Sequence, residues 1–339
     1  MGVAATMNNH HAIETSQNPN ELAHFQQEHK AFPIPDTIAS PQAAADSVCA
    51  VVVAFFPDQG FDERLRSLLP QVGMLVVVDN TPEESDARRL KKLFNDEGRV
   101  HIIENRVNVG IAAALNQGLE HALKHGRKWV LTLDQDTQCY PDMVSTLLQI
   151  YEACEPRPAV IGGNYFDPRN GRPKVPAGEA GEFLEQKTVI TSGSLIDASL
   201  ADAIGGFRED YFIDQVDHEF CLRVRAHGYR VIISRKPVMV HSVGGPGGAR
   251  LPLLGILPNH PPLRKYYIAR NTVVTISAYW RQEPEWCLRR FVRLILGLGY
   301  MAVLEENRLA KVRAFAAGIA DGIFRRLGPC RRKWLLRAD

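Results

Sequence analysis

The chain has 339 residues, of which 45% are hydrophobic and 23% are charged, as expected for a globular protein of about two domains. Its six cysteines are scattered without a CxxC pair, which argues against a structural zinc site and a disulfide framework and indicates a reducing compartment. The start of the chain lacks a signal-peptide pattern, and no apolar run reaches the ~20 residues of a membrane-spanning helix, so we expect a cytoplasmic protein, soluble or peripheral to a membrane.

The net charge of +2 conceals an uneven distribution. Residues 281–339 contain 13 Lys and Arg but only 6 Asp and Glu, so the rest of the chain is acidic. A basic end of this kind favours an anionic surface, either a membrane or nucleic acid. A solvated face of ordinary helices accounts for the same composition, so charge alone does not decide between them.

Residues 1–46 are polar and interrupted by prolines, which predicts a disordered tail. From Val48 onward, continuous apolar runs alternate with helical patterns. The apolar runs predict buried strands at residues 48–56, 74–78, 100–103 and 129–133. The intervening patterns predict helices at residues 61–69, 88–94 and 111–124. Strands that alternate with helices in this way form an open, mostly parallel sheet.

Polar side chains gather at the carboxyl ends of these strands, where sheets of this class bind ligands. Asp134 and Asp136 are two residues apart at the end of the fourth strand, so they leave the sheet at the same edge. Carboxylates suit Mg²⁺ or Mn²⁺, which also bind substrate phosphates, although two solvated turn residues would give the same pattern. The sheet carries neither a GxGxxG after a strand nor a P-loop, which excludes those two nucleotide sites.

The second half of the chain has a different pattern, with shorter segments between Gly- and Pro-rich loops. Strands are expected at residues 160–163, 188–194 and 229–234, and a helix over residues 211–225. Asp214 can cap this helix and Asp217 can interact with its dipole. With Glu219, three carboxylates fall within six residues, which is more than capping requires. A further strand leads to His241.

A proline-rich loop without regular structure is expected at residues 252–262. The helix that follows carries Arg264 and Arg270 as candidate contacts to an anion such as a diphosphate. Apolar residues then lie beside arginines between residues 289 and 298. This amphipathic, basic pattern suits either a membrane interface or an ordinary packed helix.

The order of motifs between Val48 and His241 resembles that of the inverting nucleotide-sugar glycosyltransferases of family two. The motifs are, in order, VCAVVVAFFP, VVVDN, ENRVNVGIAAALNQGL, LTLDQDT, ITSGSLI, GGF, FIDQVDHEFCLR and the late histidine. The resemblance implies the A-type (SpsA-like) glycosyltransferase fold, an open, twisted, mostly parallel α/β sheet flanked by helices. The segments DQD, FIDQVDHEFCLR and LRKYYIARN further resemble the L-rhamnosyltransferase subgroup, whose members use dTDP-L-rhamnose and act on rhamnolipids, O-antigens or other surface polysaccharides.

The resemblance also implies roles for individual residues. On the donor side, Asp79 would accept hydrogen bonds from the pyrimidine ring and Asp134 would face the ribose or sugar hydroxyls. The segment lining the nucleotide would include Asn108, Gly110 and Asn116. Gly110 also fits such a place physically, because a residue without Cβ lets the backbone approach a ligand closely. A divalent cation, Mg²⁺ or Mn²⁺, would be held by Asp136 and His241.

On the acceptor side, Asp217 would be the general base. It matches the second residue of the family's Glu-Asp motif, whose first position is Val216 here. This departure leaves the role of the missing carboxylate open, and Asp214 or Glu219 would have to compensate.

The expected reaction is therefore the inverting transfer of L-rhamnose from dTDP-L-rhamnose to a hydroxyl of a glycolipid or saccharide acceptor. A rhamnolipid precursor is favoured over a lipid-linked saccharide of O-antigen or exopolysaccharide assembly. A nucleotidylyltransferase would need a Gly-rich basic loop after the first strand, which FFPDQG does not supply. A catalytically silent sugar- or lipid-binding protein is the alternative of another class.

The same reading divides the chain into three parts. They are a tail at residues 1–46, a glycosyltransferase domain at residues 47–245, and a loop with basic amphipathic helices at residues 246–339. The domain itself has a nucleotide half (residues 47–137) and an acceptor half (residues 138–245). We expect a cytoplasmic location, either soluble or peripheral on the inner face of the cell membrane, and no nucleic-acid partner.

Overall fold

The computed structural model of the chain describes residues 41–82, 85–169, 171–176, 181–242, 249–251, 255–257 and 259–336. All of them belong to one unit, Pro35–Asp339. The tail expected at residues 1–46 lies outside the described ranges except for its end, which forms helix α2 (Pro41–Asp46). A proline at the first helical position followed by alanines is a favourable helix start, so the predicted disorder is wrong for these last residues.

Four parallel strands form the first half of the main sheet, in the order β3-β2-β1-β4. They are β1 (Val48–Ala54), β2 (Met74–Asp79), β3 (Val100–Glu104) and β4 (Trp129–Asp134). These positions confirm the predicted strands. β1 and β2 are almost wholly buried, as expected for continuous apolar runs covered on both faces.

Three helices connect these strands: α3 (Phe61–Leu68), α4 (Ser85–Leu93) and α5 (Ile111–Lys124), with the short 3₁₀ helix η1 (Leu69–Gln71) after α3. Helix α5 packs on β1 and β2. It can approach β1 closely because Gly118 has no side chain, and a Cβ at this position would clash with Cγ1 of Val51. The glycine therefore fixes the distance between α5 and the sheet.

The second half of the sheet is mixed and continues the order with β9-β6-β10-β5. These strands are β5 (Gln138–Cys139), β6 (Val160–Asp167), β9 (Ser194–Asp197) and β10 (Val231–Val240), with β7 (Arg172–Pro173) and β8 (Phe183–Glu185) paired at the side. β9 runs antiparallel to both β4 and β6, so the sheet is parallel mainly in its first half. The helices of this half are α6 (Met143–Ala153), α7 (Ala198–Ala203), η2 (Glu209–Tyr211) and α8 (Val216–Ala226).

The strand expected at residues 188–194 is misplaced. Only its last residue, Ser194, belongs to a strand, because Gly193 has a left-handed φ of 79° that interrupts extended backbone. Carbonyl groups in the preceding turn accept side-chain hydrogen bonds instead of ladder bonds. The hydroxyl of Thr132 donates to the carbonyl of Thr191 at 2.6 Å, and that of Ser194 donates to the carbonyl of Ile190 at 2.7 Å.

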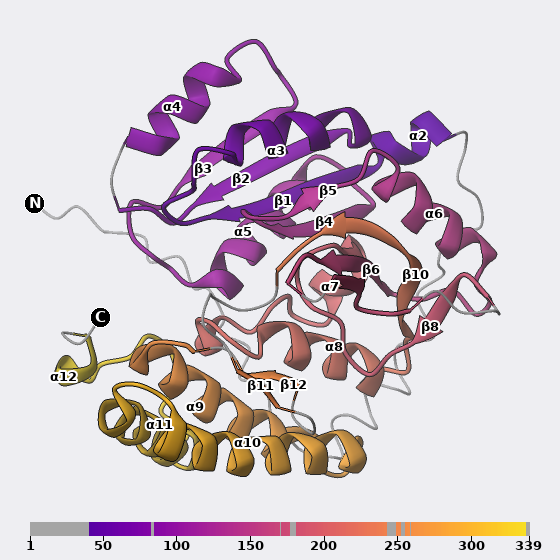
Figure 1. Cartoon of the computed structure of the whole chain (residues 1–339). Coiled ribbons are helices and arrows are strands. Elements are labelled where there is room, and N and C mark those ends of the chain that lie inside the picture. The colour runs from indigo at the N-terminus through magenta and orange to yellow at the C-terminus, as the bar shows by residue number, and fades with distance from the viewer. Residues whose placement is uncertain are drawn as a thin grey trace, which may run out of the picture. The chain divides into compact units, whose positions relative to one another are not determined.

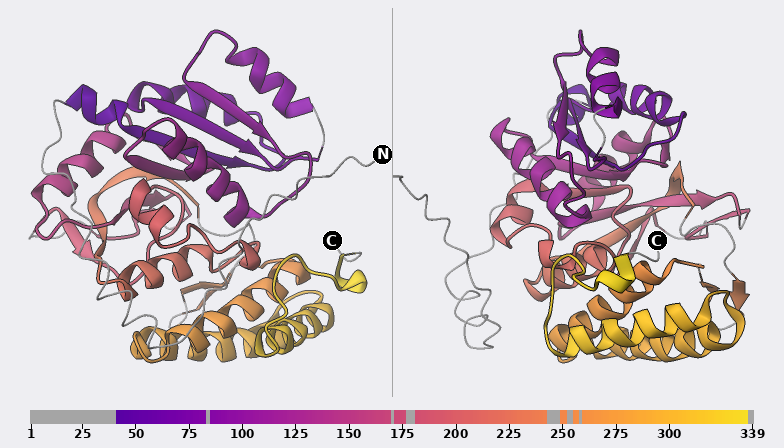
Figure 2. Two further views of the ribbon diagram at one scale, coloured as in Figure 1. Left: turned by 180° about the vertical axis from the view of Figure 1, so that it is seen from behind. Right: turned by 90° about the vertical axis from the view of Figure 1, so that its left-hand side faces the viewer.

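The C-terminal part is helical apart from a small hairpin, β11 (Ala249–Leu251) with β12 (Gly255–Leu257), in the region expected to be irregular. Its helices are α9 (Pro262–Tyr279), α10 (Pro284–Leu304), α11 (Arg308–Ile323) and α12 (Lys333–Leu336). Figures 1 and 2 show α9, α10 and α11 side by side at the lower edge. Val274 of α9 belongs to the same hydrophobic cluster as residues of β1 and β2, so this part is not separate from the core.

The described residues bear on two features of the sequence, its cysteines and its apolar helices. All six cysteines are free and buried. Within the described helices, none combines the length and the apolar character that crossing a bilayer requires.

Candidate active site

The strand register brings the polar ends of the parallel strands to one edge of the sheet. Ala54 of β1 pairs with Asp79 of β2, and the preceding Val53 pairs with Asp134 of β4. Asp79 and Asp134 therefore flank β1, roughly 10 Å apart at the usual strand spacing. This is the edge at which sheets of this class bind their ligands.

His241 completes a compact cluster with the two aspartates of the DQD segment. It follows β10, and its Nε2 lies 3.8 Å from Oδ2 of Asp134 while its Nδ1 lies 3.5 Å from Oδ1 of Asp136. The hydroxyl of Thr137 lies 3.0 Å from the same Nδ1 and 2.6 Å from the hydroxyl of Ser192. One ligand atom from each member of the cluster lies within 4.8 Å of the others, a spacing suited to one metal ion.

The electrostatics of this cluster fit a divalent cation. Burial raises the pKa of Asp134, and the nearby charge of Asp136 adds to the effect. Burial acts in the same direction on Asp136, but hydrogen bonding and attraction by His241 outweigh it and lower the pKa. Two close carboxylates and an imidazole suit Mg²⁺ or, better, Mn²⁺, whose charge would hold both acids ionised.

One large cavity joins this cluster to the acidic segment before α8. The cavity has a volume of about 1290 Å³, and its lining includes Asp134, Asp136, His241 and Asp217. Drug-sized ligands fill roughly 300–1,000 Å³, so this space can hold two substrates rather than one. The two predicted halves of the chemistry therefore face a common space.

The structure distinguishes the three carboxylates of the acidic segment by their partners. Asp214 forms an ion pair with Arg264 at 2.7 Å. Glu219 is buried, pairs with Arg223 at 3.0 Å and accepts a hydrogen bond from the hydroxyl of Tyr279 at 2.8 Å. Two of the three acids are thus occupied by structural contacts.

Asp217 is the carboxylate that stays available. Among the described residues it has no Lys or Arg within ion-pair distance, and its Oδ1 accepts a hydrogen bond from the backbone N–H of His218 at 2.7 Å. Its side chain is 21% exposed. Burial raises the pKa of Asp217 to about 6, which places it in the range of a general base that works near neutral pH.

The loop that leads into Asp217 is strained. Phe212, Asp214 and Gln215 all have left-handed φ values, between 64° and 66°. Such conformations cost about 1–3 kcal/mol each in residues with a side chain. Helix α8 begins only at Val216, so the expectation that Asp214 caps it is wrong, and its carboxylate pairs with Arg264 instead.

Helix α9 holds this strained loop in place through the residues of its LRKYYIARN segment. The amide group of Asn271 donates to the carbonyls of Tyr211, Ile213 and Asp214 at 2.8–3.0 Å. These hydrogen bonds offset part of the backbone strain. Sequence reasoning did not identify Asn271, because its role depends on a contact across roughly sixty residues.

Arg264 and Arg270 have different environments, although both were candidate diphosphate contacts. Arg264 lines the cavity beside its partner Asp214. Arg270 is fully buried and donates to the carbonyls of Asp210, Tyr211 and Gly328, so no surface is left with which it could contact a diphosphate. Its guanidinium instead supports the same loop as Asn271.

The predicted donor residues Asp79, Asn108, Gly110 and Asn116 are close to the sheet edge but do not line the cavity. Asp79 is buried and accepts the backbone N–H of Thr81 at 2.8 Å. Asn108 accepts the N–H of Gly110 at 3.0 Å. Both contacts shape turns at the rim, and the nucleotide roles of these two residues stay predictions.

The group that approaches Gly110 is the protein's own loop. Gly110 has a φ of 88°, and a Cβ there would lie 2.6 Å from the carbonyl oxygen of Phe212. Asn116 hydrogen-bonds the backbone of Phe207 in both directions, at 2.7 and 2.8 Å, and donates to Glu209. Both residues thus connect α5 to the segment before α8 in this structure. These contacts within the protein account for a glycine at position 110 and an amide side chain at position 116 without a ligand.

Cationic residues that the motifs did not reveal also line the cavity: Lys174, Arg290 and Arg293. The guanidinium of Arg290 contacts Nε2 of His218 and lies over the ring of Trp286. Burial, followed by repulsion from Arg293, lowers the pKa of Arg290 to about 10. The arginines were visible in the sequence as part of an amphipathic helix, whereas Lys174 lies in no motif.

Part of the chain is similar to a known family of proteins. Residues 49–208 match the family model of Glycosyl transferase family 2. The chain is 29% identical over 296 residues to dTDP-rhamnosyl transferase RfbF of Shigella flexneri, which covers 82% of this chain and 95% of that protein. Asp217 and His241 lie beyond the matched residues of the family model, so their assignment depends on the geometry above.

Solved structures with the same fold are more distant in sequence. TarS of S. aureus aligns with a TM-score of 0.52 and 14% identity over 81% of this chain. GalNAc-T7, whose crystal structure contains UDP, GalNAc and Mn²⁺, aligns with a TM-score of 0.53 and 12% identity over 82% of this chain. The chain spans 55% and 56% of these two proteins, so the likeness concerns the fold alone. It confirms the predicted A-type glycosyltransferase fold.

Proposed function

We propose that this chain, a glycosyltransferase of family 2, transfers L-rhamnose from dTDP-L-rhamnose to a hydroxyl group with inversion at the anomeric carbon. The relationship to a dTDP-rhamnosyl transferase along 82% of the chain supports the donor. The observation that carries the mechanism is the common cavity of Asp136 and Asp217. The proposal is supported by one space that is lined both by the cluster of Asp134, Asp136 and His241 and by the carboxylate of Asp217.

Asp217 acts as the base of the reaction. The acceptor oxygen forms a bond to the anomeric carbon, its proton passes to the carboxylate of Asp217, and the bond between that carbon and the diphosphate breaks. A base placed in this way contributes about 10²–10⁴-fold to the rate. Because no enzyme nucleophile takes part, a single displacement inverts the anomeric configuration.

Asp134, Asp136 and His241 are the residues that would hold a divalent cation, and the presence of Mn²⁺ beside UDP in the GalNAc-T7 structure supports this assignment. Such an ion, when bound, neutralises charge on the diphosphate that leaves. The protein's own contribution is to hold the two carboxylates at the rim of the sheet. The hydroxyl of Thr137 orients the imidazole of His241 and is itself hydrogen-bonded to the hydroxyl of Ser192.

The cations of the cavity favour an acceptor that carries an anionic group. Lys174 and Arg290 have no carboxylate within ion-pair distance among the described residues, and both lie in the same lining as Arg293. Like charges collected in a half-buried space repel one another unless an anion joins them. A rhamnolipid precursor offers a carboxylate, and a lipid-linked saccharide offers a diphosphate.

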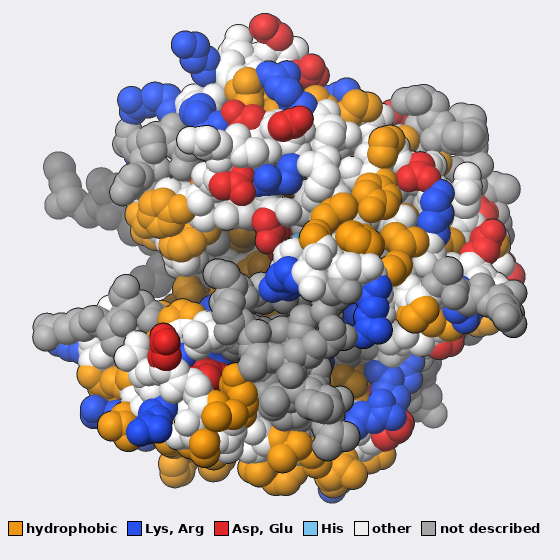
Figure 3. All heavy atoms as spheres, in the orientation of Figure 1, with side chains coloured by type: hydrophobic (Ala, Val, Ile, Leu, Met, Phe, Trp, Pro, Cys, Tyr) orange, Lys and Arg blue, Asp and Glu red, His pale blue; other side chains and the backbone are white. Residues whose placement is uncertain are grey.

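An apolar face on α10 supports an amphiphilic acceptor or a membrane surface. Leu294 and Met301 on one side of the helix are buried. The other side exposes Leu288, Phe291, Val292, Ile295, Leu296, Val303 and Leu304. Figure 3 shows hydrophobic side chains gathered along the lower edge, where α10 and α11 lie. The buried side is that of a packed helix, and the exposed apolar side supports the proposal of an interface with an amphiphilic acceptor or a membrane.

Purified protein incubated with Mn²⁺ and dTDP-L-rhamnose tests the proposal by mass spectrometry of the products. We expect one deoxyhexose to be added to a mono-rhamnolipid or to a lipid-linked saccharide, with release of dTDP. UDP-N-acetylglucosamine in place of the rhamnose donor is the matched control. Transfer from that donor alone would reject the rhamnose assignment, and the absence of transfer or hydrolysis with every donor would favour a silent binding protein.

A further inference from the structure

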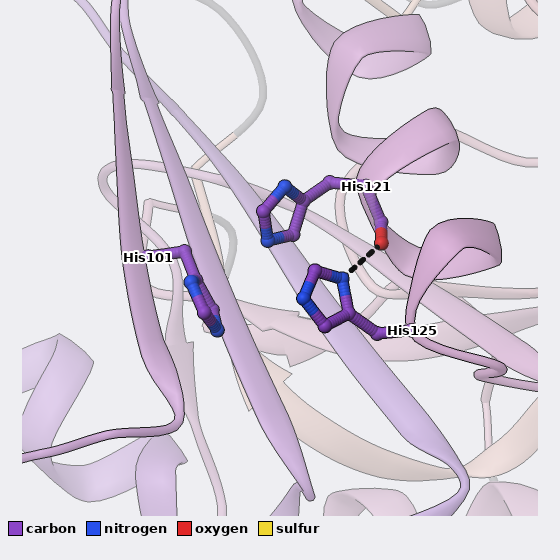
Figure 4. Close-up of side chains that lie close together, drawn as sticks. All are labelled: His101, His121 and His125. Atoms are coloured by element: carbon purple, nitrogen blue, oxygen red, sulfur yellow. Dashed lines mark hydrogen bonds between the residues drawn. The ribbon is translucent and has the colours of Figure 1, made fainter.

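Three histidines that belong to none of the motifs lie close together between strand β3 and the end of helix α5, outside the lining of the active-site cavity. His101 lies on β3, His121 lies in the last turn of α5, and His125, four residues later, caps the end of this helix. Their ring centroids are 4.4–5.2 Å apart. One nitrogen from each ring can be chosen so that all three lie within 4.8 Å of one another. Figure 4 shows the rings facing one another across the gap between strand and helix.

A backbone hydrogen bond determines which nitrogen of His125 is available. Its Nδ1 lies 2.8 Å from the carbonyl oxygen of His121. A carbonyl only accepts, so Nδ1 carries a proton, and Nε2 is the nitrogen of this ring that can coordinate an ion. Histidines that bind metals usually donate their second ring nitrogen to a carbonyl or carboxylate in this way, which fixes the ring for coordination.

The environment of the other two rings also leaves ligand atoms available. Nε2 of His121 is buried and has no hydrogen-bond partner in the described part of the chain. Burial is the largest of the effects that lower the pKa of His101 and of His121. A buried nitrogen without a partner is costly unless an ion or water satisfies it. The cluster does not border the active-site cavity, because none of its members lines it.

We propose that His101, His121 and His125 form a second metal site, for a first-row transition ion such as Zn²⁺. Three imidazole ligands suit Zn²⁺, and the same ligand set with a water in the fourth position is common in proteins. Mg²⁺ prefers oxygen ligands, so the ion of the DQD cluster would not compete for this site. The ligand set thus separates the two sites by chemistry.

The position of the site indicates a structural role. β3 is the edge strand of the sheet. Helix α5 begins at Ile111, whose backbone N–H donates to the carbonyl of Phe212, in the loop before α8, at 2.8 Å. A bound ion would join the edge strand to this helix. Because the three ligands come together only in the folded chain, Zn²⁺ would stabilise the native state as its concentration rises above the dissociation constant.

The test is a titration of the full-length protein with Zn²⁺ in the presence of excess Mg²⁺, followed by calorimetry and by thermal unfolding. We expect the wild type to bind one more Zn²⁺ per chain than His125→Gln, with an unfolding temperature that rises with Zn²⁺ concentration. His101→Gln is the second variant. Loss of either ligand should weaken Zn²⁺ binding by at least 10–100-fold, the range known for loss of outer-shell partners alone.

The chain contains a matched control for this substitution. His227 ends α8 with the same local contact as His125, its Nδ1 lying 2.8 Å from the carbonyl oxygen four residues earlier. His227→Gln therefore removes an equivalent helix-end histidine without touching the cluster. Zn²⁺ binding should be unchanged in this variant. Equal Zn²⁺ binding by His125→Gln and the wild type, or no Zn²⁺ bound in the presence of Mg²⁺, would overturn the proposal.

Discussion

Nη2 of Arg264 lies 2.7 Å from Oδ1 of Asp214, and this ion pair separates Asp214 from Asp217, the proposed base, by their partners. Asp214 is neutralised by a partner on α9, whereas Asp217, three residues later, keeps an unpaired carboxylate with a raised pKa. The residue before Asp217 is Val216, so the proposed base has no second acid directly before it in the sequence. One base is enough for a single displacement.

The first prediction concerns Asp217→Asn. The substitution keeps the shape of the side chain but removes its ability to take a proton, so kcat should fall by about 10²–10⁴-fold. The affinity for dTDP should change little, because the residue faces the acceptor. Isothermal titration with dTDP and a turnover assay measure the two quantities separately. Asp202→Asn, at an exposed position of α7, should retain both, and full turnover by Asp217→Asn would reject the base.

The second prediction is the pH dependence of the rate. The base works only when ionised, and burial raises the pKa of Asp217 from 3.8 to about 6. Activity should therefore be complete above this value and should fall tenfold per pH unit below it. A profile of kcat/KM between pH 4.5 and 8 measures the apparent pKa, where an ordinary exposed aspartate would titrate near ~3.9. A rate that stays constant down to pH 5 would contradict the assignment.

The third prediction concerns the metal cluster. Asp136→Ala removes one of the carboxylates that would hold the cation, so the dependence of dTDP affinity on Mn²⁺ should be lost. The remaining affinity should equal that of the wild type treated with a chelator. Titrations with and without Mn²⁺ decide the matter, with Asp202→Asn again as the control. A variant whose dTDP affinity still rises with Mn²⁺ would place the ion elsewhere.

The elements of the first half could be predicted because their signals are local. Continuous apolar runs rich in β-branched residues, such as Val48–Ala54, form buried strands where the sheet is covered on both faces. Because strands that alternate with helices run parallel, their carboxyl ends lie at one edge of the sheet, where ligands bind. The spacing of the aspartates in the DQD segment, at the end of a strand, made them candidates for a metal site, and the resemblance supplied their expected roles. Their meeting with His241, more than a hundred residues later, was expected only from the resemblance, since no local pattern specifies it.

The errors share a physical cause, which is that distant contacts override local preferences. Asp214 has the side chain of a helix cap, but a pair with Arg264 and hydrogen bonds from Asn271 draw its backbone into a left-handed conformation. Gly110 has the freedom of a ligand-binding glycine, yet Phe212 occupies the space beside it. The histidine cluster shows the same limit: the i, i+4 pair on α5 is visible in the sequence, but the third ligand on β3 is not.

The fourth prediction separates stability from catalysis at Glu219. This buried acid balances Arg223 and accepts the hydroxyl of Tyr279, so it acts within the core. Glu219→Ala would leave Arg223 buried without its partner and should lower the free energy of unfolding by about 3–5 kcal/mol. Urea unfolding measures the loss. The double substitution of Glu219 and Arg223 by Met should be much less destabilised, and a stable but inactive Glu219→Ala would instead make Glu219 a catalytic acid.

The last prediction tests whether α9 positions the base. Asn271→Ala removes the donors that hold the carbonyls of the strained loop, so Asp217 should move and kcat should fall by roughly 10²-fold, the typical effect of a misplacement of about 1 Å. A merely structural defect would not alter the titration of the base. A loosened loop admits water to Asp217, so the apparent pKa near 6 should fall toward the value of an exposed acid.

Ser277→Ala is the matched control on the same helix. It removes a hydroxyl that donates only to the carbonyl of Val274, within α9 itself. This variant should keep both the turnover and the pH profile of the wild type, while Asn271→Ala changes both and keeps its affinity for dTDP. If Asn271→Ala lost stability but showed an unchanged apparent pKa, α9 would support the fold without positioning Asp217. A shift confined to Asn271→Ala would instead show that the strain before α8 is maintained for the benefit of the base.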